Sequence, residues 1–170
     1  GGGSPSDTTN TEVWNGSNWT EVNNLNTARK ELGGAGTATS ALAYGGSPTP
    51  AATELWNGTN WVNQSSLNVG TTGGGGGGTT SSASYAGANP GPGIASQQWQ
   101  LGYPVGAWAT VNGVNTARQG SMGSSSGTLT ASFLAGGYTT TNVANTETWN
   151  GSNWTEVNDI NTARSTGGGA

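Results

Sequence analysis

Short runs of alternating residues, bounded by turn-forming residues, recur along the chain. In one of them Ala41 and Ala43 alternate with Leu42 and Tyr44, as expected for a strand that presents different residues to its two faces. Elsewhere an Asn-Gly pair lies between two short segments of β-forming residues, which is the strongest local signal for a β-hairpin. These patterns predict an all-β protein built from short strands.

The hairpin signal belongs to an internal repeat. The sequence TEVWNGSNW occupies residues 11–19, TELWNGTNW residues 53–61 and TETWNGSNW residues 146–154, and a divergent copy carries the remaining two Trp residues, Trp99 and Trp108, with an insertion between them. A second motif follows each Trp pair, as LNTAR (25–29), LNVGT (67–71), VNTAR (114–118) and INTAR (160–164), with spacings of 42, 47 and 46 residues. Four short strands in a unit of this length are typical of a β-propeller blade.

These residues resemble the kelch repeat, in which an Arg, a Gly pair, an aromatic residue and a Trp follow one another. One unit carries Arg29, Gly45-Gly46, Trp56 and Trp61 at these positions, and another carries Arg118, Gly136-Gly137, Trp149 and Trp154. Trp replaces the usual Tyr, and the spacing between the two aromatic residues is one residue shorter than in the family. In its Asn, Gly and Thr content the chain is similar to the tandem kelch-like repeats of marine phage and bacterial surface proteins. The resemblance implies a kelch-like β-propeller of about four short four-stranded blades, or a segment of a larger propeller or repeat array.

We expect one repeat domain over residues 1–170, divided where the motifs recur. Its parts are the outer strands of a first blade (1–28), a blade (29–70), a divergent blade (71–117), another blade (118–163) and the start of a next or closing strand (164–170). The two terminal parts together are about one strand short of a complete blade. The chain is therefore expected to be a segment of a longer array, or to receive the missing strand from a neighbouring copy.

Most of the repeated residues are expected to be structural. The paired indoles should pack between neighbouring blades, where each buries roughly 150–250 Å², and they are Trp14, Trp19, Trp56, Trp61, Trp149 and Trp154. The charges vary together, because Arg29 with Glu54 and Arg118 with Glu147 correspond to Thr71 with Gln97 in the divergent unit. This covariation predicts a partly buried Arg–Glu contact within each of two blades. By the same register Arg164 has no Glu after it, and Glu12 has no Arg before it.

Composition narrows the chemistry that the chain can perform. Gly, Thr, Asn and Ser make up more than half of the 170 residues, and there is no Cys or His, which excludes thiolate nucleophiles, disulfides and His-based catalytic pairs. Charged residues are 7% of the chain and the net charge is −4, which disfavours binding to nucleic acid. No apolar run is long enough to span a bilayer, so we expect no membrane insertion. We expect no metal and no cofactor.

The recurring carboxylates do not suggest an active site, because Glu12, Glu54 and Glu147 occupy equivalent repeat positions. We expect a protein that is not an enzyme and that serves as a structural or assembly module of an extracellular or virion surface fibre, through self-association or contact with neighbouring repeats. The alternative is a glycan- or receptor-binding adhesin domain, because aromatic rings beside amides suit sugars. Its candidate ligand-binding residues are Trp99, Tyr103, Trp108, Gln98 and Gln100. An intracellular kelch-type scaffold is a third hypothesis, which the scarcity of charge disfavours.

Overall fold

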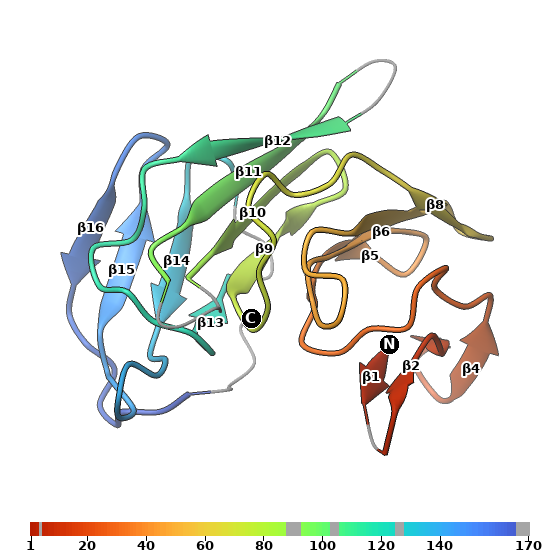
Figure 1. The fold of residues 1–170 in the computed structure, drawn as a ribbon, viewed down its shortest axis with the longest axis horizontal. Helices are drawn as coiled ribbons and strands as arrows, with labels where there is room; N and C mark the ends of the chain where they lie inside the picture. Colours follow the sequence, from red (N-terminus) through yellow and green to blue (C-terminus); the bar gives the residue numbers. More distant parts are fainter. Residues whose placement is uncertain (4, 88–92, 103–105, 125–127, 166–170) are drawn as a thin grey trace.

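The protein is built from short antiparallel β-strands. The computed structural model describes residues 1–3, 5–87, 93–102, 106–124 and 128–165, and this part of the chain contains no helix. Three four-stranded sheets follow one another, and within each the strands are neighbours in chain order (Figure 1). Their strands are β5 (Gly33–Thr37), β6 (Ser40–Tyr44), β7 (Thr53–Trp56) and β8 (Trp61–Asn63); β9 (Gly75–Thr79), β10 (Ser82–Ala86), β11 (Ser96–Leu101) and β12 (Gly106–Val111); and β13 (Met122–Gly123), β14 (Ser132–Ala135), β15 (Thr146–Trp149) and β16 (Trp154–Val157).

The N-terminal region forms two smaller sheets. Strands β1 (Gly2–Gly3) and β2 (Asp7–Thr8) pair with each other, and β3 (Thr11–Trp14) pairs with β4 (Trp19–Val22). The hairpin β3–β4 corresponds to β7–β8 and β15–β16, because in all three the two Trp residues of the repeat lie directly opposite each other. The hairpin of the N-terminal unit therefore corresponds to the two outer strands of a larger sheet.

Tight Asn-Gly turns connect the outer strands of three units. In the turn of β7–β8 the side-chain oxygen Oδ1 of Asn57 accepts hydrogen bonds from the backbone N–H groups of Thr59 and Asn60, at 2.9 and 2.8 Å. Gly58 has a φ of 92°, a conformation that glycine adopts without steric cost. The turns at Asn15 and Asn150 have the same bonds. These bonds explain why the tetrapeptide Asn-Gly-Ser/Thr-Asn recurs.

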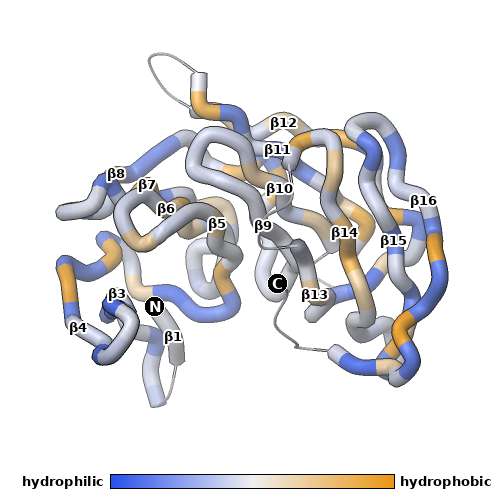
Figure 2. The backbone as a smooth tube through the Cα atoms, turned by 180° about the vertical axis from the view of Figure 1, so that it is seen from behind, coloured by the Kyte–Doolittle hydropathy of each residue, from blue (hydrophilic) through white to orange (hydrophobic). Residues whose placement is uncertain are grey.

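The first strands of the three large sheets lie side by side, and this close approach requires glycine. Strand β9, pale along its length in Figure 2, packs against both β5 and β13. A Cβ atom on Gly76 would lie 2.5 Å from the carbonyl oxygen of Ser84, and one on Gly123 would lie 2.5 Å from the backbone nitrogen of Gly76. Residues 75–78 of the glycine run 73–78 thus form most of an inner strand, and the run is not a flexible linker.

The core lies between the sheets. One apolar cluster joins β6 to the divergent sheet and contains Leu42, Tyr44, Leu67, Ala83, Tyr85, Trp99 and Trp108. A second joins the divergent sheet to the last one and contains Ala86, Val114, Leu134, Trp149 and Trp154. Since each cluster draws residues from two neighbouring sheets, burial between sheets stabilises the array.

The predicted all-β fold of short strands is confirmed. The large sheets span residues 33–63, 75–111 and 122–157, each inside one of the expected repeat units. The described residues do not form a closed propeller, and they contain three four-stranded sheets where about four were expected. The difference lies at the N-terminus, where β3–β4 is a two-stranded sheet by itself.

Candidate functional site: a junction repeated between neighbouring sheets

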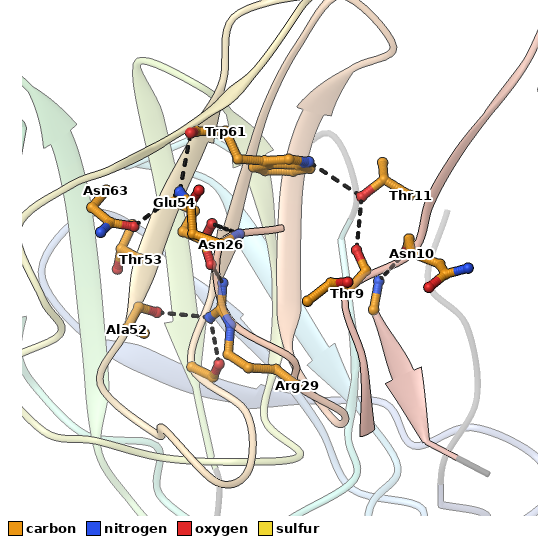
Figure 3. A network of polar contacts seen from close by, with 12 residues as sticks. Thr9, Asn10, Thr11, Asn26, Arg29, Ala52, Thr53, Glu54, Trp61 and Asn63 are labelled. Atoms are coloured by element: carbon orange, nitrogen blue, oxygen red, sulfur yellow. Dashed lines mark hydrogen bonds and ion pairs between the residues drawn. The ribbon is translucent and has the colours of Figure 1, made fainter. Parts of the chain in front are cut away.

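In two of the large sheets, a buried Arg–Glu ion pair connects the loop before the first strand to the third strand. Arg29, in the loop before β5, donates from Nη2 to Oε1 of Glu54 on β7 at 2.8 Å, and both side chains are at most 1% exposed (Figure 3). Arg118 and Glu147 form the equivalent pair in the last sheet, and both are fully buried. The structure thus brings together both Arg–Glu pairs that covariation indicated, and it buries them completely where partial burial was expected.

Further bonds hold each ion pair in place. Arg29 Nη1 donates to the carbonyl oxygens of Gly45 and Ala52, at 2.8 and 3.0 Å. The second carboxylate oxygen of Glu54 accepts a bond from the backbone N–H of Asn26 at 2.7 Å. Burial lowers the pKa of the Arg29 guanidinium, and the charge of Glu54 opposes this effect. The carboxylate therefore fixes both the arginine and the loop that leads into the sheet.

The divergent sheet replaces the ion pair by a neutral contact. Gln97 on β11 accepts a hydrogen bond from the backbone N–H of Val69 at 3.0 Å and donates one to the carbonyl oxygen of the same residue at 2.8 Å. Thr71, at the arginine position, is 4% exposed. The amide thus clamps the preceding loop as Glu54 does, without a buried charge that would need a partner.

In the three large sheets, the second Trp of the outer hairpin links the sheet to the preceding unit. Its indole N–H donates to a side-chain hydroxyl of the preceding unit, in the pairs Trp61–Thr11 (3.2 Å), Trp108–Thr53 (3.0 Å) and Trp154–Ser96 (3.0 Å). The first Trp instead donates to a turn carbonyl of its own sheet, in the pairs Trp56–Ala38, Trp99–Thr80 and Trp149–Leu129. The two indoles of one hairpin therefore have different roles.

Asparagine side chains complete the connection from the other direction. The Nδ2 groups of Asn26, Asn68 and Asn115 donate to the carbonyl oxygens of Trp61, Trp108 and Trp154, at 3.0, 2.8 and 2.9 Å. Two more, Asn23 and Asn112, reach the hairpin turn of the following sheet. We call the complete set the junction. The preceding unit contributes its loop and the hydroxyl that accepts the hydrogen bond from the indole N–H, and the following unit contributes the Glu or Gln and the second Trp.

The junction occurs three times among the described residues and is split once. Glu12 occupies the position of Glu54 in the repeat, and Arg164 occupies the position of Arg29. Both side chains are exposed, and the structure does not bring them together. Trp14 and Trp19 are 47% and 65% exposed, whereas Trp56 and Trp154 are 4% and 7% exposed. The first pair therefore does not pack between sheets as expected, because no sheet formed by the described residues covers this face of β3–β4.

Two of the candidate ligand-binding residues of the divergent unit, Trp99 and Trp108, are buried. Trp99 and Trp108 are 0% and 5% exposed, with their rings packed in the core between sheets, so neither has a free face for a sugar. Gln98 donates to the carbonyl oxygen of Leu129. Gln98, the exposed Gln100 and the edge of Trp108 line one depression of about 400 Å³, so the structure brings these three predicted residues together. Tyr103 lies outside the described residues.

Sequence reasoning missed the hydroxyl and asparagine contacts. A signal existed, since Thr11, Thr53, Ser96 and Thr146 occupy one position of the repeat and all carry a hydroxyl. The Asn of each NTAR motif recurs in the same way. Neither pattern reveals its partner, because the partner belongs to the neighbouring unit.

No group of three or more Asp or Glu side chains that could hold a metal ion occurs in the described ranges. Over the same residues no helix is long and apolar enough to cross a membrane.

The comparisons with known proteins concern the fold. No model of a protein family matches the chain, and no curated protein matches its sequence. Among solved structures the chain is similar to that of YjhT, with a TM-score of 0.77 and 10% sequence identity over 99% of this chain and 68% of that one. At this identity the likeness concerns the fold alone, and it identifies the chain as an all-β protein of short antiparallel sheets arranged like those of YjhT.

Proposed function

We propose that this chain is a non-enzymatic structural module of the kelch type, and that it assembles with like modules into a fibre or filament on an extracellular or virion surface. The kelch assignment is supported by the repeated Arg, Gly-Gly and Trp residues and by the four-stranded sheets in which they lie. The likeness to the fold of YjhT is consistent with it.

One observation carries the proposal: the same junction is built three times, and its two complementary halves are exposed at different ends of the described chain. Each internal junction combines a buried ion pair or amide clamp, an indole hydrogen bond and an asparagine bond. Surfaces that already join unit to unit inside a chain can join further units by the same contacts. Assembly therefore requires no chemistry beyond what the repeat supplies.

Negative-stain electron microscopy of the purified chain over a range of concentrations tests this proposal. We expect elongated particles of uniform width whose length increases with concentration. Uniform single-chain particles at every concentration would contradict an assembly function, and irregular clumps without constant width would indicate aggregation and contradict it as well.

A further inference from the structure

We propose that the two halves of the split junction bind each other between copies of this chain, head to tail. This inference rests on the proposed assembly function and specifies the contact that produces it. The C-terminal half consists of Thr146 and the loop residues Asn158, Ile160, Asn161 and Arg164. The N-terminal half consists of the hairpin β3–β4 with Glu12, Trp14 and Trp19, the turn at Ser17 and Asn18, and Glu21.

The loop of the C-terminal half already has the conformation found in the complete junctions. The backbone N–H of Ile160 donates to Ala144 at 3.1 Å, and that of Arg164 donates to Val143 at 3.2 Å. The carbonyl oxygen of Arg164 accepts a bond from the N–H of Gly137 at 2.7 Å. Leu25 and Arg29 make the same three bonds in the first complete junction, to Thr9, Thr8 and Gly2.

The loop is thus preformed, while its functional side chains face solvent. Arg164, Asn161 and Asn158 are all exposed. Arg164 Nε bonds to the carbonyl oxygen of Thr162 in its own loop, as Arg118 Nη1 bonds to that of Thr116. An arginine held by its own loop in this way needs little reordering to meet a carboxylate, which lowers the entropic cost of binding.

The N-terminal half offers the matching groups. Glu12 occupies the position of Glu54, and it lies opposite Glu21 across the hairpin, so two carboxylates mark this face. Glu12 and Trp19 also border an open pocket of about 380 Å³, whose other walls are the N-terminus, Leu25 and the first large sheet. The large exposed area of Trp19 and the negative charge beside it suit a loop that carries a cation and an apolar residue. The C-terminal loop carries both, as Arg164 and Ile160.

The repeat register assigns the contacts one by one. By analogy with the complete junctions, Arg164 of one copy would pair with Glu12 of the next, as Arg118 pairs with Glu147. The Asn161 amide would donate to the Trp19 carbonyl, as Asn115 does to that of Trp154. The Trp19 indole would donate to Thr146 Oγ1, as Trp154 does to Ser96. Asn158 would reach the turn at Ser17 and Asn18, as Asn112 reaches that at Ser152 and Asn153.

The placement of the two halves favours a second copy as the occupant. The hairpin β3–β4, which carries the N-terminal half, and strand β16, which leads into the loop of the C-terminal half, lie at opposite ends of the molecule in both Figure 1 and Figure 2. A contact between two different surfaces at opposite ends is heterologous, and it adds copies in a row unless the rotation closes a ring. Charge complementarity also sets the direction, because Glu12 meets Arg164 in only one orientation.

Charge reversal tests the contact. The variants Glu12→Arg and Arg164→Glu each place like charges across the contact between identical copies, whereas a mixture of the two variants restores opposite charges at every contact. In sedimentation velocity we expect each variant alone to associate at least about 30-fold more weakly than the wild type, the change that corresponds to losing a close interfacial charge pair. The mixture should recover to within about tenfold of the wild type.

Matched controls separate this effect from net charge and from misfolding. Glu31→Arg makes the charge change of Glu12→Arg at an exposed position outside both halves, and Lys30→Glu makes that of Arg164→Glu. Lys30→Glu also breaks the exposed ion pair with Asp7, which lies outside both halves, so both controls should associate as the wild type does. Both test positions are exposed, so circular dichroism and thermal unfolding of the isolated variants should match those of the wild type.

The other outcomes overturn the inference in distinguishable ways. If the wild type assembles and both single variants assemble equally well, the junction is wrong while the assembly function stands. If all forms are monomeric, and each single variant loses thermal stability that only the double variant on one chain regains, the two halves close within a single chain. If the wild type is monomeric and no variant has any effect, both the inference and the proposed function fail.

Discussion

The buried pair Arg29–Glu54 gives the most informative perturbation of the fold, because Glu54→Gln changes a charge without changing the size of the side chain. The glutamine can still accept the bond from the Asn26 N–H, which is 2.7 Å long in the wild type. It cannot neutralise Arg29, whose side chain is fully buried. The substitution therefore leaves a cation inside the protein with only the carbonyl oxygens of Gly45 and Ala52 for partners.

The expected cost follows from this geometry. Removing one member of a buried ion pair destabilises a protein by about 3–5 kcal/mol. Because two carbonyl bonds to Arg29 survive, we expect about 3 kcal/mol for Glu54→Gln and, since those bonds are lost, about 4 kcal/mol for Arg29→Thr. The double variant copies the neutral pair Thr71 and Gln97 and buries no charge, so it should cost no more than Arg29→Thr alone and well below the sum of about 7 kcal/mol.

Urea unfolding followed by tryptophan fluorescence measures these free energies for the wild type, the two single variants and the double variant. Asp7→Asn serves as a control, because it breaks the Lys30–Asp7 ion pair, whose side chains are 46% and 23% exposed, and should cost less than about 1 kcal/mol. If the single costs simply add to within about 0.5 kcal/mol, the two residues do not act as a pair and the reasoning is refuted.

Three further predictions test other parts of the structure. Thr53→Val leaves the buried Trp108 indole N–H without its acceptor and should lower the free energy of unfolding by about 1–3 kcal/mol, whereas Thr146→Val, the same repeat position in the last sheet, should cost less than about 0.5 kcal/mol; equal costs in urea unfolding would refute the role of the hydroxyl. Gly76→Ala brings a Cβ to 2.5 Å from the Ser84 carbonyl oxygen and should cost at least about 1–3 kcal/mol, so an unchanged melting temperature would contradict the close packing of β9. Burial raises the pKa of both Tyr44 and Tyr85, so above about pH 10 the folded state holds more protons than the unfolded state and stability must fall as pH rises. The fall in the urea midpoint between pH 8 and pH 10.5 should be smaller in Tyr44→Phe than in the wild type; an unaltered fall in Tyr44→Phe would count against this assignment.

Much of the fold could be predicted because the same short-range interactions recur in several units of the repeat. The Asn-Gly turns need no partner outside four residues, so the hairpins at Trp56 and Trp149 could be read directly from the chain. The Arg–Glu pairs could be inferred because the divergent unit changes both members together. In each case the evidence lies within one unit.

Contacts between units were harder to predict. The acceptor of the Trp61 indole is Thr11, fifty residues earlier, and nothing in either local sequence identifies the other. The insertion between Trp99 and Trp108 suggested a ligand site, yet the positions of these residues in the sheet place both rings in the core. The exposure of Trp14 and Trp19 likewise depends on which neighbour covers them and not on their own motif.

Small-angle X-ray scattering of the wild-type chain over a concentration series tests the central claim most directly. If the split junction joins copies in a row, the apparent mass and the longest dimension should rise together with concentration while the cross-section stays that of one chain. An apparent mass fixed at that of a single 16.8 kDa chain would contradict the account.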